Sequence, residues 1–160
     1  MTQARPAAPT VANDEREAAW RLFIETSTRV AGALDDQLRT DAQMSLSDYH
    51  VMLLLHEAPE QRLRMKDLAA RMVFSASRLT YQVDVLCRRG WLRREPVPSD
   101  RRGSYAILTD AGHAAFAAAG RGHFDLVQQI FYDVLTPEDG RTLAAIMTKI
   151  DHRLDDKERP

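Results

Sequence analysis

The sequence of 160 residues has a single cysteine, Cys87, so no disulfide can form within the chain. It also has no apolar run approaching the roughly 20 residues that are needed to cross a bilayer. The opening segment, MTQARPAAPTVAN, lacks an apolar core of signal-peptide length, and its proline and alanine content predicts a disordered tail over residues 1–12. Together these absences favour a protein of the reducing cytoplasm that does not enter a membrane.

Catalytic and metal-binding motifs are missing as well. The sequence has no G-x-S-x-G, no glycine-rich phosphate loop and no second cysteine, so nothing indicates an enzyme. The sequence contains five histidines but no CxxC or HExxH motif. His50 and His56 are six residues apart, and His113 and His123 are ten apart. Ordinary histidines are favoured over a metal site formed between distant helices, and we expect no cofactor and no metal.

Charge is spread unevenly along the chain. The whole sequence carries a net charge of −1, yet Arg62 to Arg102 contains eleven basic and four acidic residues, which leaves −8 for the remainder. A basic centre in an acidic chain is typical of a surface that meets phosphates. The alternative is a basic stretch that merely keeps the protein soluble, and the motifs within the stretch decide between the two.

The central motif is a helix predicted over residues 75–89. Ser75 can cap it, and Phe74 can pack against Leu79 as a hydrophobic staple. Leu79, Val83 and Leu86 recur at helical spacing and predict a narrow buried stripe, while Gly90 predicts a left-handed C-cap. The opposite side is polar and carries Ser77, Arg78, Tyr81 and Arg88.

Two short strand-like runs, residues 91–95 and 104–108, follow this helix and are joined by the loop PVPSDRRG. A helix with a polar, arginine-bearing face followed by a basic-tipped hairpin is the layout of a winged helix-turn-helix. In that layout the helix enters the major groove of double-stranded DNA, and the hairpin lies along the backbone or in the adjacent minor groove. Ser77, Arg78 and Tyr81 are placed to meet base edges, since the N-terminal half of such a helix enters the groove first. Arg78 can bind guanine with two hydrogen bonds, and a phosphate contact is the alternative for Tyr81. Arg88 lies nearer the C-terminal end of the helix, where we expect a phosphate contact.

The elements around this motif are mainly helical. We expect a first helix capped by Asn13 or Asp14 and reaching about Thr40, and a second helix capped by Ser47. A short strand over 62–64 and a helix over 65–72 complete the predicted winged helix-turn-helix lobe, residues 46–109. The predicted fold class is therefore mainly α with a small β-hairpin wing.

The remaining helices predict a second layer. One should run from Thr109 to about Val134, with a bend near its glycines at 120–122, and another should begin at Thr136. Residues 13–45 and 110–157 hold more apolar surface than a monomer of this size easily hides, so we interpret them as a dimerisation region within one compact domain. Its predicted contact residues are Leu143, Ile146, Met147, Ile150 and Leu154.

The chain resembles the MarR family of transcription regulators from about Asp14 to Leu154. The residues that carry the resemblance are Leu46-Ser47, Met65-Lys66-Asp67-Leu68-Ala69, Val83-Asp84-Val85-Leu86, Gly90-Trp91-Leu92, the wing signature Asp100-Arg101-Arg102, Leu108-Thr109 and Gly112. The resemblance implies that Asp100 holds an arginine side chain in place while Arg102 projects into the minor groove. The predicted DNA contacts are Ser75, Ser77, Arg78, Tyr81, Arg88, Asp100, Arg101 and Arg102.

The resemblance further implies a homodimer on a pseudo-palindromic site, more often a repressor than an activator. It also implies a small, often aromatic, effector that binds between the DNA-binding lobe and the helical layer. Candidate crevice residues are Trp20, Phe23, Tyr49, His50 and Met52. For Trp20 and Phe23 a place in the core is the alternative, because aromatic residues at helical spacing are commonly core residues.

Three matters stay open at this stage. An architectural DNA-binding dimer would share the basic helix and wing but show little sequence preference. A protein-interaction module would use the helical layer and show no salt-dependent DNA binding. Cys87 lies beside Arg88 and Arg89, cations that can lower the pKa of a thiol, although a structural cysteine is the favoured interpretation.

Overall fold

The computed structural model describes residues 11–72 and 74–158, with side chains described from residue 15 to residue 154 except those of 73 and 101. Its elements in chain order are α1 (Val11–Ala42), α2 (Leu46–His56), a 3₁₀ turn (Pro59–Gln61), β1 (Arg62–Arg64), α3 (Met65–Met72), α4 (Ala76–Arg88), β2 (Leu92–Val97), β3 (Asp100–Leu108), α5 (Asp110–Ile130), a second 3₁₀ turn (Tyr132–Val134) and α6 (Pro137–Glu158). The predicted fold class, mainly α with a small wing, is confirmed.

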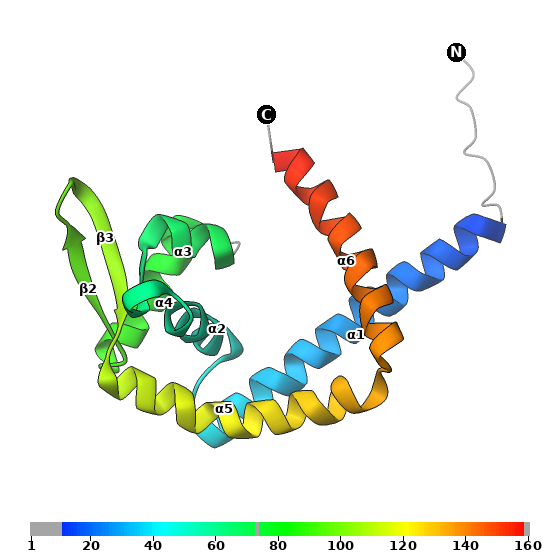
Figure 1. Cartoon of the computed structure of the whole chain (residues 1–160), viewed down its shortest axis with the longest axis horizontal. Coiled ribbons are helices and arrows are strands. Elements are labelled where there is room, and N and C mark those ends of the chain that lie inside the picture. Colours follow the sequence, from blue (N-terminus) through cyan, green and yellow to red (C-terminus); the bar gives the residue numbers. More distant parts are fainter. Residues whose placement is uncertain (1–10, 73, 159–160) are drawn as a thin grey trace, which may run out of the picture.

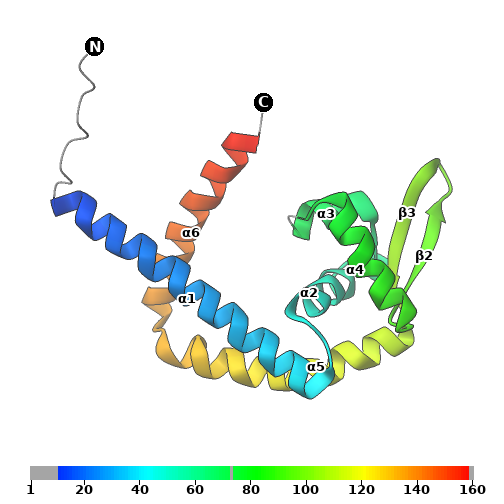
Figure 2. The same cartoon turned by 180° about the vertical axis from the view of Figure 1, so that it is seen from behind.

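The chain forms a winged lobe on two long helical arms. In Figures 1 and 2, α2, α3, α4 and the β2–β3 hairpin gather at one end of α5, while α1 crosses α5 and α6 rises away from its other end. The three strands pair antiparallel in the order β1-β3-β2. A single apolar core joins the lobe to the arms, and its fully buried members include Leu38 of α1, Leu55 of α2 and Leu86 of α4.

Helix α2 begins earlier than predicted. Ser45, not Ser47, is the N-cap: its side chain accepts a hydrogen bond from Asp48 N at 3.0 Å, and the Asp48 carboxylate accepts from Ser45 N at 2.9 Å. This reciprocal capping box satisfies two amides that the start of the helix leaves unpaired, an advantage that Ser47 cannot offer. Helix α1 also begins earlier than predicted, at Val11, so Asn13 and Asp14 lie inside the helix and do not cap it. Residues 11–12 of the predicted tail therefore belong to α1, and residues 1–10 lie outside the described residues.

The wing hairpin is longer than predicted. β2 continues to Val97 and β3 starts at Asp100, so most of the predicted loop 96–103 is strand and only Pro98 and Ser99 form the turn. The pairing has an irregularity between Pro96 and Val97, and a bulge of this kind lets a proline stand in an edge strand without breaking it.

Helix α5 runs without interruption through the glycines at which a bend was expected, and it ends at Ile130 rather than Val134. Gly122 instead serves the packing of α1 on α5, since a Cβ there would lie 2.9 Å from the Gln37 Nε2 atom of α1. The predicted start of α6 is confirmed, because the Thr136 side chain accepts a hydrogen bond from Asp139 N. Nearly all described side chains of α6 are exposed, so the helix has little cover from its own chain.

Candidate nucleic-acid interface

Helix α4 has the two-sided character that the sequence predicts. Leu79, Val83 and Leu86 are at most 1% exposed, whereas Ser77, Arg78, Tyr81 and Arg88 face solvent. Ser75 caps the helix by accepting a hydrogen bond from Arg78 N at 3.3 Å, and Gly90 follows its end with a φ of +75°. Tyr81 is 68% exposed, so both its ring and its hydroxyl are open to solvent. The exposed face is therefore free to meet a macromolecule.

Arg78 is held at the start of this face. Its guanidinium lies 4.0 Å from the centre of the Phe74 ring, within the range of a cation–π contact. Phe74 in turn packs against the core, so the predicted staple residue also supports the arginine. This contact limits the positions that the guanidinium samples before it binds a partner.

Asp100 acts on the wing in a way that differs from the expectation. Its Oδ1 atom accepts a hydrogen bond from the backbone amide of Arg102 at 3.1 Å, and among the described residues it pairs with no arginine side chain. Gly103 leaves room for this turn, since a Cβ there would lie 2.6 Å from Asp100 Oδ2. The carboxylate therefore shapes the backbone on which Arg102 stands. The side chain of Arg101 lies outside the described residues.

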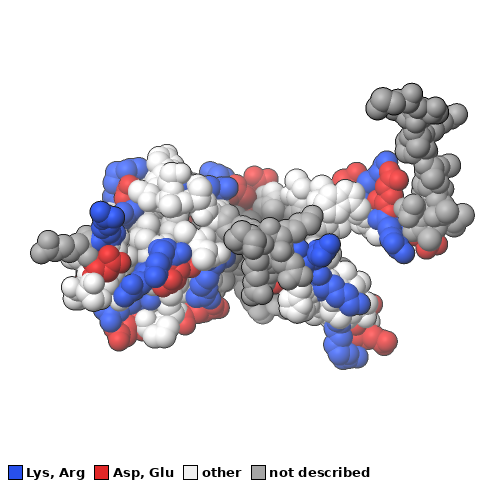
Figure 3. Space-filling view, turned by 90° about the horizontal axis from the view of Figure 1, so that it is seen from above, with Lys and Arg blue, Asp and Glu red and all other residues white. Residues whose placement is uncertain are grey.

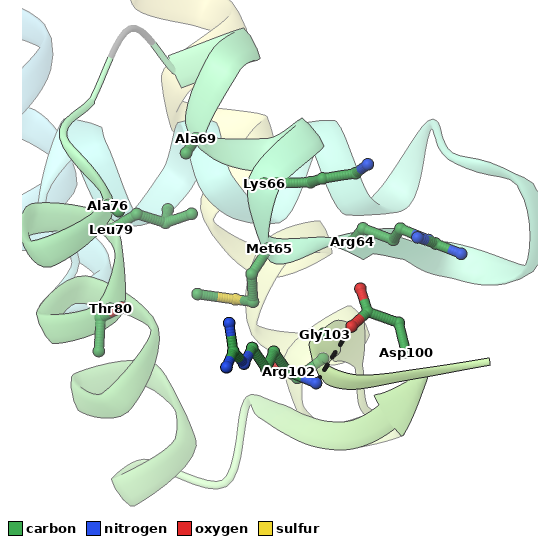
Figure 4. A pocket seen from close by; sticks show the side chains of 11 residues that line it. Arg64, Met65, Lys66, Ala69, Ala76, Leu79, Thr80, Asp100, Arg102 and Gly103 are labelled. Atoms are coloured by element: carbon green, nitrogen blue, oxygen red, sulfur yellow. Dashed lines mark hydrogen bonds between the residues drawn. The ribbon is translucent and has the colours of Figure 1, made fainter. Parts of the chain in front are cut away.

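A groove of about 280 Å³ lies between α3, α4 and the wing (Figure 4). Its walls include the apolar side chains of Met65, Ala69 and Leu79. Basic side chains at the groove are Arg64, Lys66 and Arg102, with Asp100 as the acidic one. In Figure 4 the Arg102 side chain runs back toward Met65 and α4, whereas Arg64 and Lys66 point to the other side. Arg102 is exposed, but in this conformation it lies along the groove.

The basic residues of the lobe fall into two groups. Arg62, Arg93 and Arg94 pair with Glu60, Glu95 and Asp84, respectively, and Arg89 donates a hydrogen bond to a backbone carbonyl. Among the basic residues of the lobe with described side chains, those that make neither an ion pair nor a side-chain hydrogen bond are Arg64, Lys66, Arg71, Arg78, Arg88 and Arg102. In the view from above, lysine and arginine side chains are spread over the winged lobe with a few acidic ones between them (Figure 3). Basic side chains that have no partner within the chain are available to contact a phosphate backbone.

The five candidate crevice residues do not share one environment. Trp20 and Phe23 lie on α1 with 60% and 37% exposure, and their ring centres are 6.1 Å apart. His50 is exposed, whereas Met52 is completely buried in the core and so lines no open crevice in this structure, contrary to the expectation. A core position was the physically simpler place for Met52, because it falls on the apolar side of α2.

Tyr49 belongs to an aromatic stack between α2 and α5. Its ring centre lies 4.9 Å from that of Phe116 and 4.3 Å from that of His123. Burial raises the pKa of Tyr49 and lowers the pKa of His123, and the Nδ1 atom of His123 is buried with no hydrogen-bond partner among the described residues. His123 was not among the candidates, although its place on the inner side of a predicted helix was a signal that could have included it.

The described residues show neither a metal-ligating cluster nor a cysteine with a lowered pKa. His56 and His113 approach to 5.2 Å between ring centres, but no group of three or more metal-ligating side chains occurs among the described residues. Burial raises the pKa of Cys87, and the nearby Arg94 opposes this only in part, so the lowered pKa considered from the sequence is wrong. Within the described residues, no helix is both long and apolar enough to cross a membrane.

The predicted dimer residues form an apolar strip along α6. Leu143 is half-buried, and the exposed fractions of the others run from 36% for Met147 to 56% for Leu154. Further exposed apolar side chains lie on α1, on the second half of α5 and just after it; they are Trp20, Leu22, Ile24, Phe124, Phe131 and Tyr132. Clustered exposure of this kind is typical of a surface that another chain covers.

Comparison with known proteins gives one consistent result. A family model described as MarR family matches residues 42–103. The crystal structure of a MarR family transcriptional regulator from Streptomyces coelicolor in complex with DNA is 40% identical, with a TM-score of 0.87, and the match covers 93% of this chain and 92% of that one. The regulator PecS of Dickeya dadantii is 27% identical over 141 residues, 83% of this chain and 82% of PecS. An uncharacterized regulator of Bacillus subtilis, YkoM, is 36% identical over 67 residues, which is 42% of each chain.

Proposed function

Because this chain belongs to the MarR family of transcription regulators, we propose that it binds double-stranded DNA as a homodimer and represses transcription from a pseudo-palindromic operator in the cytoplasm. The observation that carries the proposal is the exposed polar face of α4, with Ser77, Arg78 and Tyr81 above a fully buried apolar stripe. A helix fixed in this manner presents its N-terminal half to the edges of bases in a major groove.

The wing supplies the second contact in this proposal. Arg102 is exposed near the start of β3, where Asp100 holds its backbone amide, and it lines the same groove as the basic side chains of Arg64 and Lys66. When DNA approaches, the guanidinium of Arg102 leaves the groove and enters the minor groove, where narrow A·T tracts concentrate negative potential. Arg88, at the end of α4, contacts a phosphate. This division gives the helix most of the sequence preference and gives the wing much of the affinity.

Dimerisation rests on the apolar surfaces that the single chain leaves open. In Figures 1 and 2, α6 stands apart from the winged lobe, and the first half of α1 extends away from it. A second copy that packs against them covers the strip from Leu143 to Leu154 and places two copies of α4 on one side of the dimer. Half-sites about one helical turn apart follow from that symmetry.

A small aromatic effector completes the proposal. It binds between the lobe and the helical layer, close to the stack of Tyr49, Phe116 and His123. Its effect is to favour a separation of the two lobes that no longer fits the operator. A panel of small aromatic compounds, titrated into the protein–operator complex, tests this part, and a panel without any effect would remove the effector from the proposal.

The central experiment is selection of bound duplexes from a random DNA pool with the full chain. We expect an enriched pseudo-palindrome, and we expect the double variant Arg78→Ala/Arg102→Ala, used as a control, to enrich none. Salt-dependent binding without an enriched sequence would indicate an architectural DNA-binding protein instead. Absence of any salt-dependent binding would indicate a protein-interaction module.

A further inference from the structure

Helix α4 is tied at its C-terminal end to the segment that connects α1 with α2. Arg89, the residue after the helix, donates a hydrogen bond from Nη1 to the carbonyl oxygen of Gln43 at 2.5 Å, across 46 residues of sequence. The Arg89 guanidinium also lies 4.8 Å from the centre of the Trp91 ring. Gln43 is the first residue after α1 and has a φ of +53°, so its carbonyl is turned out of the helical direction.

A second tie joins the middle of α4 to the first turn of α2, next to the connecting segment. Gln82 donates a hydrogen bond from Nε2 to the Oδ1 atom of Asp48, which is only 6% exposed. The other oxygen of Asp48 accepts from the amide and the hydroxyl of Ser45 at 2.9 and 2.7 Å. Gln82 therefore reaches the connecting segment through Asp48.

The connecting segment is itself fixed to α1. The amide of Leu46 donates to Asp35 Oδ1 at 2.7 Å, the amide of Met44 donates to the carbonyl of Leu38 at 3.2 Å, and the Met44 side chain is 1% exposed. The Arg89 and Gln82 bonds therefore oppose a rotation of α4 relative to α1.

From this arrangement we infer that Arg89 and Gln82 are positioning residues that set the angle between α4 and α1, and through it the half-site spacing that the dimer accepts. Neither residue has to touch DNA, since each side chain is directed at a group of its own chain. The inference rests on the proposed function, because α1 belongs to the proposed dimer layer. It adds a pair of residues that select operators by geometry, whereas Arg78 and Tyr81 select them by contact.

The test measures the affinity of the full chain for two duplexes: the operator obtained by selection, and the same operator with one base pair inserted between its half-sites. The readout is the spacing ratio, the dissociation constant for the operator with the insertion divided by that for the selected operator. A lower ratio means that the protein discriminates less well between the two spacings. A uniform loss of affinity or of positive charge cancels in this ratio, and so does a partial loss of folded protein. We expect Arg89→Ala to lower the ratio by roughly 2- to 30-fold, the range seen when a coupling residue is removed.

Arg93→Ala is the matched control. It removes the same charge from the same lobe, but Arg93 pairs with Glu95 inside the wing, so the ratio should stay at the wild-type value. Arg89→Lys keeps a long side chain that can donate a hydrogen bond, so its ratio should lie between those of Arg89→Ala and the wild type. Gln82→Leu should lower it without any change of charge, and this variant decides the matter if Arg89→Ala does not fold.

The outcomes separate the inference from the proposed function. A wild-type protein that selects no operator would reject the proposed function. A wild-type protein that discriminates between the two spacings, while Arg89→Ala and Gln82→Leu discriminate equally well, would reject the positioning role alone. An equal change of the ratio in Arg93→Ala and Arg89→Ala would also reject it, because the effect would then come from charge.

Discussion

Single arginines in the winged lobe have two distinct tasks. Arg89 and Arg94 satisfy groups of their own chain, and Arg94 does so twice, through Asp84 Oδ1 at 2.9 Å and the carbonyl of Thr80 at 3.1 Å. Arg78, Arg88 and Arg102 are exposed and have no carboxylate partner among the described side chains. Sequence alone gives these residues the same formal charge, so only their partners distinguish the structural arginines from those available for the proposed contact with DNA.

Arg102→Ala should weaken operator binding by roughly 1–3 kcal/mol, because it removes the proposed minor-groove contact. The fold should not change, since the side chain is exposed and the turn depends on the backbone amide, which alanine keeps. Titration of the operator at matched salt measures the loss, and a thermal melt is the control for folding. Unchanged affinity would remove Arg102 from the interface.

Arg88→Ala and Arg78→Ala should affect DNA binding in different ways: the first should lower affinity for any duplex, and the second should lower sequence preference. Arg88 is exposed at the end of α4, so its loss should weaken operator and scrambled duplex alike and lower the salt slope by about one unit per subunit. Loss of Arg78, which lies at the start of the helix over Phe74, should erode the preference for the operator at one position in each half-site. Binding of both variants to both duplexes across a range of salt checks this. The reverse pattern would mean that α4 enters the groove by its other end.

His123 should make stability depend on pH. Burial lowers its pKa below the ordinary value of 6.5, so the unfolded chain binds its proton at a higher pH than the folded chain does. The contribution of the neutral His123 side chain to the free energy of unfolding is therefore fully present above about pH 6.5. It is lost as the pH falls through the lowered pKa of the folded state. Urea unfolding between pH 5 and pH 8 should show this decline, and His123→Phe, which keeps a ring beside Tyr49, should reduce it.

Tyr49→Phe is the control for the His123 experiment. It alters the same stack without removing a group that titrates below about pH 8, so the decline toward acid should persist. A decline of equal size in His123→Phe and in the wild type would assign the pH dependence to other groups.

At the level of elements, the junction between the wing and α5 depends on close backbone approach. Thr109 caps α5 by accepting a hydrogen bond from Gly112 N at 3.0 Å, and its own amide donates to the carbonyl of Trp91 at 3.0 Å. A Cβ on Gly112 would overlap that carbonyl oxygen. Gly112 thus lets the end of the α4–β2 connection sit directly on the first turn of α5.

Gly112→Ala should lower the free energy of unfolding by about 1–3 kcal/mol, the usual cost of forcing an extra carbon into a packed site. Gly32→Ala is the matched control, because a Cβ there meets nothing within 4 Å and alanine favours a helix interior. That variant should be neutral or more stable by up to about 1 kcal/mol. Urea titration of both variants measures the contrast, which would be absent if the junction relaxed freely.

At the level of the whole molecule, α1 and α6 carry the exposed apolar surface on which the proposed dimer rests. The structure leaves Ile146, Met147, Ile150 and Leu154 exposed along one side of α6, and the helix stands apart from the lobe in Figure 1. A single copy would keep this apolar surface in water, and a dimer removes that cost.

Replacing Leu143 and Ile150 with Asp should dissociate the dimer and abolish tight operator binding, because like charges would face each other across the two-fold contact. Sedimentation measures the first effect and operator titration the second. Ala145→Asp/Thr148→Asp, which adds the same charge to the opposite side of α6, should remain dimeric. A Leu143/Ile150 variant that still sediments as a dimer would place the contact elsewhere.

The sequence by itself determined the local features of this protein. The span of α3, the capping of α4 by Ser75, the left-handed Gly90 and the start of α6 depend on residues within one or two helical turns, and all were predicted correctly. The polar face of α4 was predictable for the same reason, since period and capping are local properties. The family followed from the same short motifs together with their order along the chain.

Tertiary structure decided the rest. The capping box of Ser45 with Asp48 is local, but tertiary structure adds the bond from Gln82 of α4 to the same carboxylate. The bond from Arg89 to Gln43 spans 46 residues, and no spacing rule along the chain indicates it. The raised pKa of Cys87 depends on its cover by neighbouring elements. Contacts between distant segments exist only after the elements pack, because packing alone fixes which side chains lose their water and which partners replace it.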